Sequence, residues 1–172
     1  MNAGGHGSDM AASLVSIRVV RLDGGEHVEV PADQLDLGYR SSNLTASTVV
    51  VDATLELAVG DPARSRAEID DIVRWRRANQ PGGPNAGSVF RNPPDDHAGR
   101  LVEAAGCKGL RLGSAQVSDK HANFIQADPG GRAGDVLALM VEVRRRVREA
   151  TGIDLHPETV LLGFNPPPEV EG

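Results

Sequence analysis

The sequence has a single cysteine, Cys107, and aromatic residues make up only 3% of its 172 residues. One cysteine cannot form an internal disulfide, which fits a reducing compartment and leads us to expect a cytoplasmic protein. Scarce aromatic side chains leave few platforms for stacking bases. The net charge of −6 also disfavours nucleic-acid binding, because phosphate contacts need a concentrated basic face. We expect the four arginines within 144–148 to lie on a solvated helix face.

Long apolar runs are also missing. No stretch approaches the ~20 apolar residues that span a bilayer, so we expect no membrane segment. The polar, glycine-rich start lacks the basic flank and apolar centre of a signal peptide. The five histidines show no metal-ligand spacing, and no metal site is predicted. The remaining composition, 40% hydrophobic and 24% charged, is that of an ordinary globular protein.

The first half of the chain is predicted to be mostly β-structure. Runs rich in β-branched residues flank the turn Asp23-Gly24-Gly25, which is typical of a β-hairpin. Asp61 and Pro62 are typical of a helix start, and Trp75 is expected to pack against a sheet. The expected elements are strands at 13–22, 27–30 and 45–57, a helical turn at 31–35 and a helix at 63–79.

The second half alternates short strands with helices. Asp95 or Asp96 can cap a short helix that Gly106 ends, and Gly152 closes a longer one. Cys107 is interpreted as a small buried hydrophobic residue. The expected elements are helices at 98–105 and 133–151, strands at 110–113, 123–125 and 159–162, and a disordered tail at 165–172. This order predicts an α+β fold with a mostly antiparallel sheet and a boundary near 80–84.

One stretch, residues 85–93 (Asn-Ala-Gly-Ser-Val-Phe-Arg-Asn-Pro), has the composition of a site. The small residues before Ser88 would let a substrate approach its hydroxyl closely. Arg91 and Asn92 add a cation and an amide that both donates and accepts hydrogen bonds. Taken alone, the stretch can also be an ordinary hairpin entrance with a solvated serine and arginine.

Three further motifs accompany this stretch in order along the chain: residues 37–42 (Leu-Gly-Tyr-Arg-Ser-Ser), 116–125 (Gln-Val-Ser-Asp-Lys-His-Ala-Asn-Phe-Ile) and 155–158 (Leu-His-Pro-Glu). Together the four motifs resemble UDP-N-acetylenolpyruvoylglucosamine reductase, from residue 1 to about 163. The resemblance implies the remainder of an FAD-binding domain at 1–80, a small α+β substrate-binding domain at 81–163 and a tail at 164–172.

The resemblance also implies a reaction. NADPH would reduce FAD, and a hydride would then pass to UDP-N-acetylglucosamine enolpyruvate, giving UDP-N-acetylmuramate for peptidoglycan synthesis. The matching positions make Ser88 the proton donor, while Arg40 and Glu158 would hold and polarise the charge that develops beside the carboxylate. The remaining matched positions are Tyr39, Arg91 and Asn92 for substrate binding and Asn2, Ala3, Gly4, Gly5 and Gly7 along the flavin.

Some features depart from the family pattern. Arg91 stands where lysine is usual, and His156 replaces an acid. The glycine-rich loops that hold the FAD pyrophosphate precede the family segment matched by residue 1, so we expect an incomplete enzyme whose partner is an N-terminal flavin-binding segment. The alternatives are a stand-alone UDP-sugar-binding module without redox activity, or a non-functional truncated product. On their own, residues 2–12 would be interpreted as a frayed N-terminus. His121 and Asn123 are interpreted as structural residues.

Overall fold

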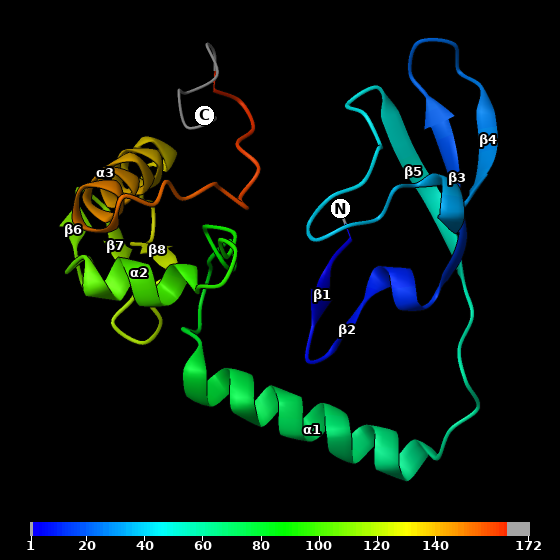
Figure 1. Cartoon of the computed structure of the whole chain (residues 1–172), viewed down its shortest axis with the longest axis horizontal. Coiled ribbons are helices and arrows are strands. Elements are labelled where there is room, and N and C mark those ends of the chain that lie inside the picture. Colours follow the sequence, from blue (N-terminus) through cyan, green and yellow to red (C-terminus); the bar gives the residue numbers. More distant parts are fainter. Residues whose placement is uncertain (1, 165–172) are drawn as a thin grey trace. The chain divides into compact units, whose positions relative to one another are not determined.

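The computed structural model describes residues 2–164 and divides into two compact units after Ile72, within helix α1 (Pro62–Asn79) (Figure 1). Both units combine strands with helices, so the expected α+β class is confirmed. The sequence places the boundary near residues 80–84, and that domain assignment stays a prediction.

The first unit is built on a three-stranded antiparallel sheet in the order β4-β3-β5. Its strands are β3 (Leu14–Arg21), β4 (His27–Pro31) and β5 (Thr48–Leu55), joined after β4 by the short 3-10 helix η2 (Ala32–Gln34). The expected hairpin and helical turn are therefore confirmed. A small core of Ile17, Val19 and Leu35 fills one side. Strand β5 is shorter than predicted, and most of its side chains remain exposed.

The N-terminal residues form a defined hairpin, so the frayed-end alternative is wrong for residues 2–12. Strands β1 (Gly4–Gly5) and β2 (Ser8–Asp9) pair antiparallel and lead into the 3-10 helix η1 (Met10–Ala12). Buried Asn2 fastens the base of this hairpin: its amide donates to Asp9 at 2.9 Å and accepts from the Ala11 backbone N–H at 2.9 Å. These bonds stabilise a loop whose glycines would otherwise favour many conformations.

Helix α1 begins as predicted. The carboxylate of Asp61 accepts from the Ala63 backbone N–H at 2.9 Å and so caps the first turn. None of the 18 residues of α1 is buried, and Trp75 is 50% exposed. The expectation that Trp75 is a packing residue is therefore wrong within the described chain.

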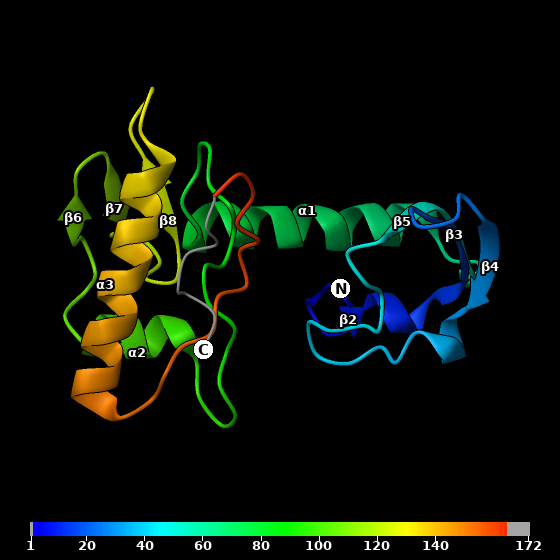
Figure 2. The same ribbon diagram turned by 90° about the horizontal axis from the view of Figure 1, so that it is seen from above.

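After the end of α1, the second unit contains two further helices and a three-stranded sheet in the order β6-β7-β8 (Figure 2). Helix α3 (Ala133–Thr151) packs against this sheet and against α2. The other elements are α2 (Ala98–Ala104), β6 (Arg111–Leu112), β7 (Ala115–Val117) and β8 (Ile125–Ala127). Helix α3 has the predicted bounds, and Gly152 ends it in the left-handed conformation that glycine tolerates.

Three sequence predictions for this unit need correction. Strand β7 was not predicted, because it is only three residues long and no alternation is visible over so short a run. The strand expected at 123–125 is β8, shifted to Ile125–Ala127. Residues 159–162 form no strand, and the segment before them contributes only an isolated bridge between Pro157 and Phe90. The tail at 165–172 lies outside the described residues.

Two kinds of feature are not found between residues 2 and 164. No helix there is both long and apolar enough to cross a bilayer. No group of three or more His, Cys, Asp or Glu side chains comes close enough together in that range to hold a metal ion.

Cys107 is completely buried in the core of the second unit, as its interpretation as a small hydrophobic residue predicts. Burial raises the pKa of its thiol, since the thiolate is poorly solvated there. We expect a thiol reagent such as dithiobis-nitrobenzoate to label the native chain at least ~100-fold more slowly than the urea-unfolded chain. Equal labelling rates in the two states would contradict the buried position.

Candidate active site

The stretch around Ser88 passes from an exposed loop into the core of the second unit. Gly87 has a φ of +78°, a left-handed conformation that favours glycine, and its N–H donates to the Asn85 side chain at 2.9 Å. Val89 and Phe90 are 3% and 2% exposed, respectively. Ser88 is therefore half-buried, between the hydrogen-bonded turn at Gly87 and the core residues Val89 and Phe90.

Asn123 binds the main chain of this stretch like a neighbouring strand. Its side-chain amide accepts from the Phe90 N–H at 3.0 Å and donates to the Phe90 carbonyl at 2.8 Å. The backbone carbonyl of Asn123 accepts from the Val89 N–H at 2.9 Å. With 4% exposure, Asn123 has the structural role that the sequence suggests, since it satisfies polar groups that burial would otherwise leave unpaired.

The Glu158 segment pairs with the same stretch on its other side. The Glu158 N–H donates to the Val89 carbonyl at 2.8 Å, and the Arg91 N–H donates to the His156 carbonyl at 2.9 Å. Two motifs far apart in the sequence, at 85–93 and 155–158, are thus joined by main-chain hydrogen bonds. The fold brings Ser88 and Glu158 into adjacent segments of one unit.

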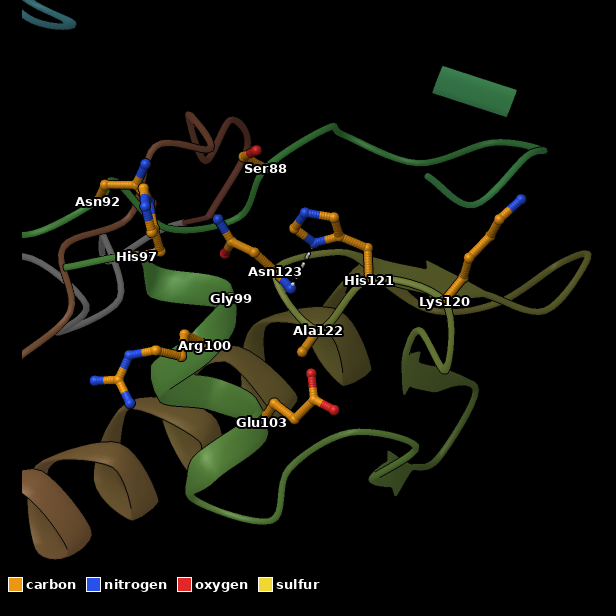
Figure 3. Close-up of a pocket in the computed structure, with 10 residues that line it drawn as sticks. All are labelled: Ser88, Asn92, His97, Gly99, Arg100, Glu103, Lys120, His121, Ala122 and Asn123. Carbon is orange, nitrogen blue, oxygen red and sulfur yellow. Dashed lines mark hydrogen bonds between the residues drawn. The ribbon is translucent and has the colours of Figure 1, made fainter. Parts of the chain in front are cut away.

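A pocket of about 440 Å³ opens beside Ser88 (Figure 3). One wall is the face of helix α2, and the other comes from the loop that precedes β8. Ser88 and Asn92 border it from the first stretch. The lining residues are Ser88, Asn92, His97, Gly99, Arg100, Glu103, Lys120, His121, Ala122 and Asn123.

The charges around the pocket are partly neutralised by pairing. Arg100 forms an ion pair with Asp96, and this bond, with the His97 N–H, lowers the pKa of the Asp96 carboxyl to about 2. Glu103 pairs with Lys108 at 3.0 Å. Lys120 donates to the backbone carbonyl of Arg77. Both cations of the rim, Arg100 and Lys120, therefore have partners here, and an anionic ligand would exchange those contacts for its own.

Of the predicted substrate residues in this unit, Asn92 has a clear structural contact. Its side-chain oxygen accepts from the Ala98 N–H at 3.0 Å, so Asn92 satisfies the first N–H of α2, whose N-cap residue is His97 and not the predicted Asp95 or Asp96. Asp96 instead accepts from the His97 N–H at 2.7 Å. Arg91 is exposed. Substrate contacts by Arg91 and Asn92 stay predictions.

Arg40 and Tyr39 lie in the first unit, whereas Ser88 and Glu158 lie in the second. Gly38 and Ser41 exchange two backbone hydrogen bonds across a tight turn, which puts Arg40 at a φ of +54°. A non-glycine residue in this region costs energy and is often found at functional sites. The guanidinium lies 5.1 Å from the Tyr39 ring centroid and donates to the Gly4 carbonyl at 3.2 Å.

The hydrogen bond to Gly4 connects Arg40 with the segment predicted to lie along the flavin. A Cβ atom added to Gly5 or Gly7 would meet nothing within 4 Å, so the backbone is open to close approach by a flat ring system. At Gly4 a Cβ would lie 2.8 Å from the Cβ of Asp9. Ala3 is exposed, whereas Asn2 is occupied with holding the hairpin. The segment fits one wall of a flavin site, and its contacts with a flavin stay predictions.

Sequence reasoning did not single out the α2 residues of the pocket. His97, Arg100 and Glu103 recur every three residues along the helix, a spacing that places them on one face. That spacing is the signal in the sequence, but the apolar residues Leu101 and Val102 on the buried side of α2 give a stronger one.

Known proteins resemble this chain in sequence and in fold. Residues 78–162 match the family model described as UDP-N-acetylenolpyruvoylglucosamine reductase, C-terminal domain. The UDP-N-acetylenolpyruvoylglucosamine reductase 2 of Symbiobacterium thermophilum is 44% identical over 168 residues, covering 96% of this chain and 54% of the relative. The chain belongs to the UDP-N-acetylenolpyruvoylglucosamine reductase family.

Other family members give the same result. The Bacillus subtilis reductase is 40% identical over 169 residues, covering 96% of this chain and 55% of the relative. The crystal structure of the Thermus caldophilus reductase superposes with a TM-score of 0.79 at 35% identity, covering 92% of this chain and 56% of that one. The chain thus spans about half the length of the curated relatives it matches, and it corresponds to their C-terminal part.

The Asn123 contacts predict a large effect on stability. Asn123→Leu would leave the buried Phe90 N–H and carbonyl unpaired, and at about 1–3 kcal/mol for each group the free energy of unfolding should fall by about 2–6 kcal/mol. Urea denaturation followed by circular dichroism measures the loss. As a matched control, Asn79→Leu removes an exposed amide that donates to Trp75 and should change stability by less than about 0.5 kcal/mol. Equal losses in the two variants would disprove the structural role.

Proposed function

We propose that the chain supplies the substrate-binding and proton-donating part of a UDP-N-acetylenolpyruvoylglucosamine reductase. The observation that carries the proposal is the pairing of the Ser88 stretch, whose Ser88 and Asn92 border the pocket, with the Glu158 segment. Family membership supplies the reaction, the reduction of UDP-N-acetylglucosamine enolpyruvate to UDP-N-acetylmuramate. We place it in the cytoplasm, where NADPH and nucleotide sugars occur, as a step of peptidoglycan synthesis.

The proposed cofactors are FAD and NADPH. When bound, the flavin supplies a hydride to one carbon of the enolpyruvyl double bond. Gly4, Gly5 and Gly7 would lie along it, since the open backbone at Gly5 and Gly7 allows close approach. Arg40, which already donates to the Gly4 carbonyl, would connect this segment to the substrate carboxylate.

The residues of this chain would stabilise the developing negative charge and donate the proton. The second carbon of the double bond, next to the carboxylate, gains negative charge in the transition state. The Arg40 guanidinium is permanently charged and planar, so it suits the carboxylate, and Glu158 would polarise the same region. The Ser88 hydroxyl would then donate its proton to that carbon. A neutral hydroxyl is sufficient because the carbon is a strong base.

A second candidate function is a stand-alone UDP-sugar-binding module. It is favoured by one observation, that the pocket and its bordering motifs all lie within the second unit. Such a module would bind the nucleotide sugar without reducing it.

A chimaera distinguishes the two functions. The 172 residues would replace the matching part of the Bacillus subtilis reductase, and the purified chimaera should oxidise NADPH only when UDP-N-acetylglucosamine enolpyruvate is added. Mass spectrometry of the product should show UDP-N-acetylmuramate. Binding of the nucleotide sugar by calorimetry without any turnover would favour the module instead.

In the same chimaera, Ser88→Ala tests the proton donor. Losing a positioned general acid should slow reduction of the enolpyruvyl substrate by ~10² or more, while NADPH oxidation by ferricyanide continues at the unmodified rate. Ser65→Ala, on exposed helix α1, serves as the control and should alter neither rate. An unchanged rate at saturating substrate in the Ser88 variant would remove this hydroxyl from the mechanism.

A further inference from the structure

The His121 ring, which lines the pocket, is held by contacts with Phe124 and with the backbone of Asn123. It lies edge-on to the Phe124 ring, with centroids 4.9 Å apart and planes 68° apart. Across from it, α2 carries Gly99, where a Cβ atom would come within 3.2 Å of the His121 Cε1. A glycine at this position gives the imidazole room to lie against the helix backbone.

One ring nitrogen has a fixed role. The backbone N–H of Asn123 donates to the His121 Nδ1 at 3.2 Å, as the dashed line in Figure 3 shows. A backbone N–H can only donate, so Nδ1 must be the unprotonated nitrogen. A neutral imidazole in this state carries its hydrogen on Nε2. In Figure 3 the second ring nitrogen lies on the side of the ring toward Ser88, in the pocket.

The surroundings keep the ring neutral. Burial lowers the pKa of His121, because an imidazolium would be poorly solvated there. The nearby ammonium of Lys108 lowers it further, while the carboxylate of Glu103 acts in the opposite direction. Near neutral pH, His121 therefore presents a single fixed N–H donor.

We propose that His121 is a ligand-binding residue whose Nε2–H donates to a phosphate oxygen of the nucleotide sugar. Arg100 and Lys120 line the same pocket and can contact a phosphate there in exchange for Asp96 and the Arg77 carbonyl, while the acidic Glu103 is paired with Lys108. Asn123, which positions the imidazole, also positions Phe90, so one residue sets the geometry of both the donor and the Ser88 stretch. The inference rests on the proposed function, because it takes the ligand from it.

Calorimetric titration with UDP and with uridine tests the donor. His121→Phe keeps a flat ring and removes Nε2–H, so it should weaken UDP binding by about 10-fold or more. His121→Gln retains an N–H donor at similar reach and should stay within about 3-fold of the unmodified chain. Uridine has no phosphate, and its affinity should be the same in all three proteins.

Gly99→Ala provides an independent variant that does not touch the imidazole chemically. The alanine Cβ would come within 3.2 Å of the His121 Cε1 and shift the ring, which should weaken UDP binding about 3- to 10-fold and leave the affinity for uridine unchanged. A purely structural role for His121 would change the affinities for UDP and uridine alike. Nitrogen-15 NMR of the imidazole should show a protonated Nε2 and an unprotonated Nδ1.

The outcomes separate the two hypotheses. If the unmodified chain binds UDP and the phenylalanine variant binds it equally well, this inference is wrong and the proposed function stands. A protonated Nδ1 in the NMR spectrum also overturns it. If the unmodified chain binds no UDP at millimolar concentration, the nucleotide-sugar pocket itself is disproved, and the proposed function falls with the inference.

Discussion

The stability of the second unit depends on one side chain, the amide of Asn123. It makes the two backbone hydrogen bonds that a neighbouring strand would otherwise make. Residues 88–91 enter the core without belonging to any sheet, so the buried peptide of Phe90 needs partners for its N–H and its carbonyl. Asn123 supplies both, and its own backbone carbonyl binds Val89. An aspartate could not donate and a leucine could do neither. The site is thus built on irregular backbone that a single amide makes stable.

Several other features follow from that constraint. With one edge of residues 88–91 bound to Asn123, the other edge is available to the segment at 156–158, and this pairing places Glu158 near Ser88. The Asn123 backbone N–H in turn orients His121. A short loop before β8 therefore determines how three motifs are arranged, which explains why the candidate site can lie in segments with little regular secondary structure.

The sequence predicted the elements whose signals are local. The sequence correctly indicated the helix cap at Asp61, the bounds of α3 and its end at Gly152. Each of these depends on only a few neighbouring residues. Strand β7 and the irregular pairing of residues 156–158 depend on partners distant in the sequence, and no local pattern marks them. For the site, family motifs indicated Ser88, Arg40 and Glu158, while the pocket face of α2 and the exposure of Trp75 emerged only from the structure.

The pairing of residues 89–91 with 156–158 also bears on how the unit folds. These segments lie near the two ends of the second unit, so joining them closes a loop that contains α2, the β6–β8 sheet and α3. Closing so long a loop costs chain entropy that only the packed interior can offset. The two proposed catalytic segments therefore meet late, after the intervening elements have assembled, and a partly folded chain would keep helix α3 while having no site.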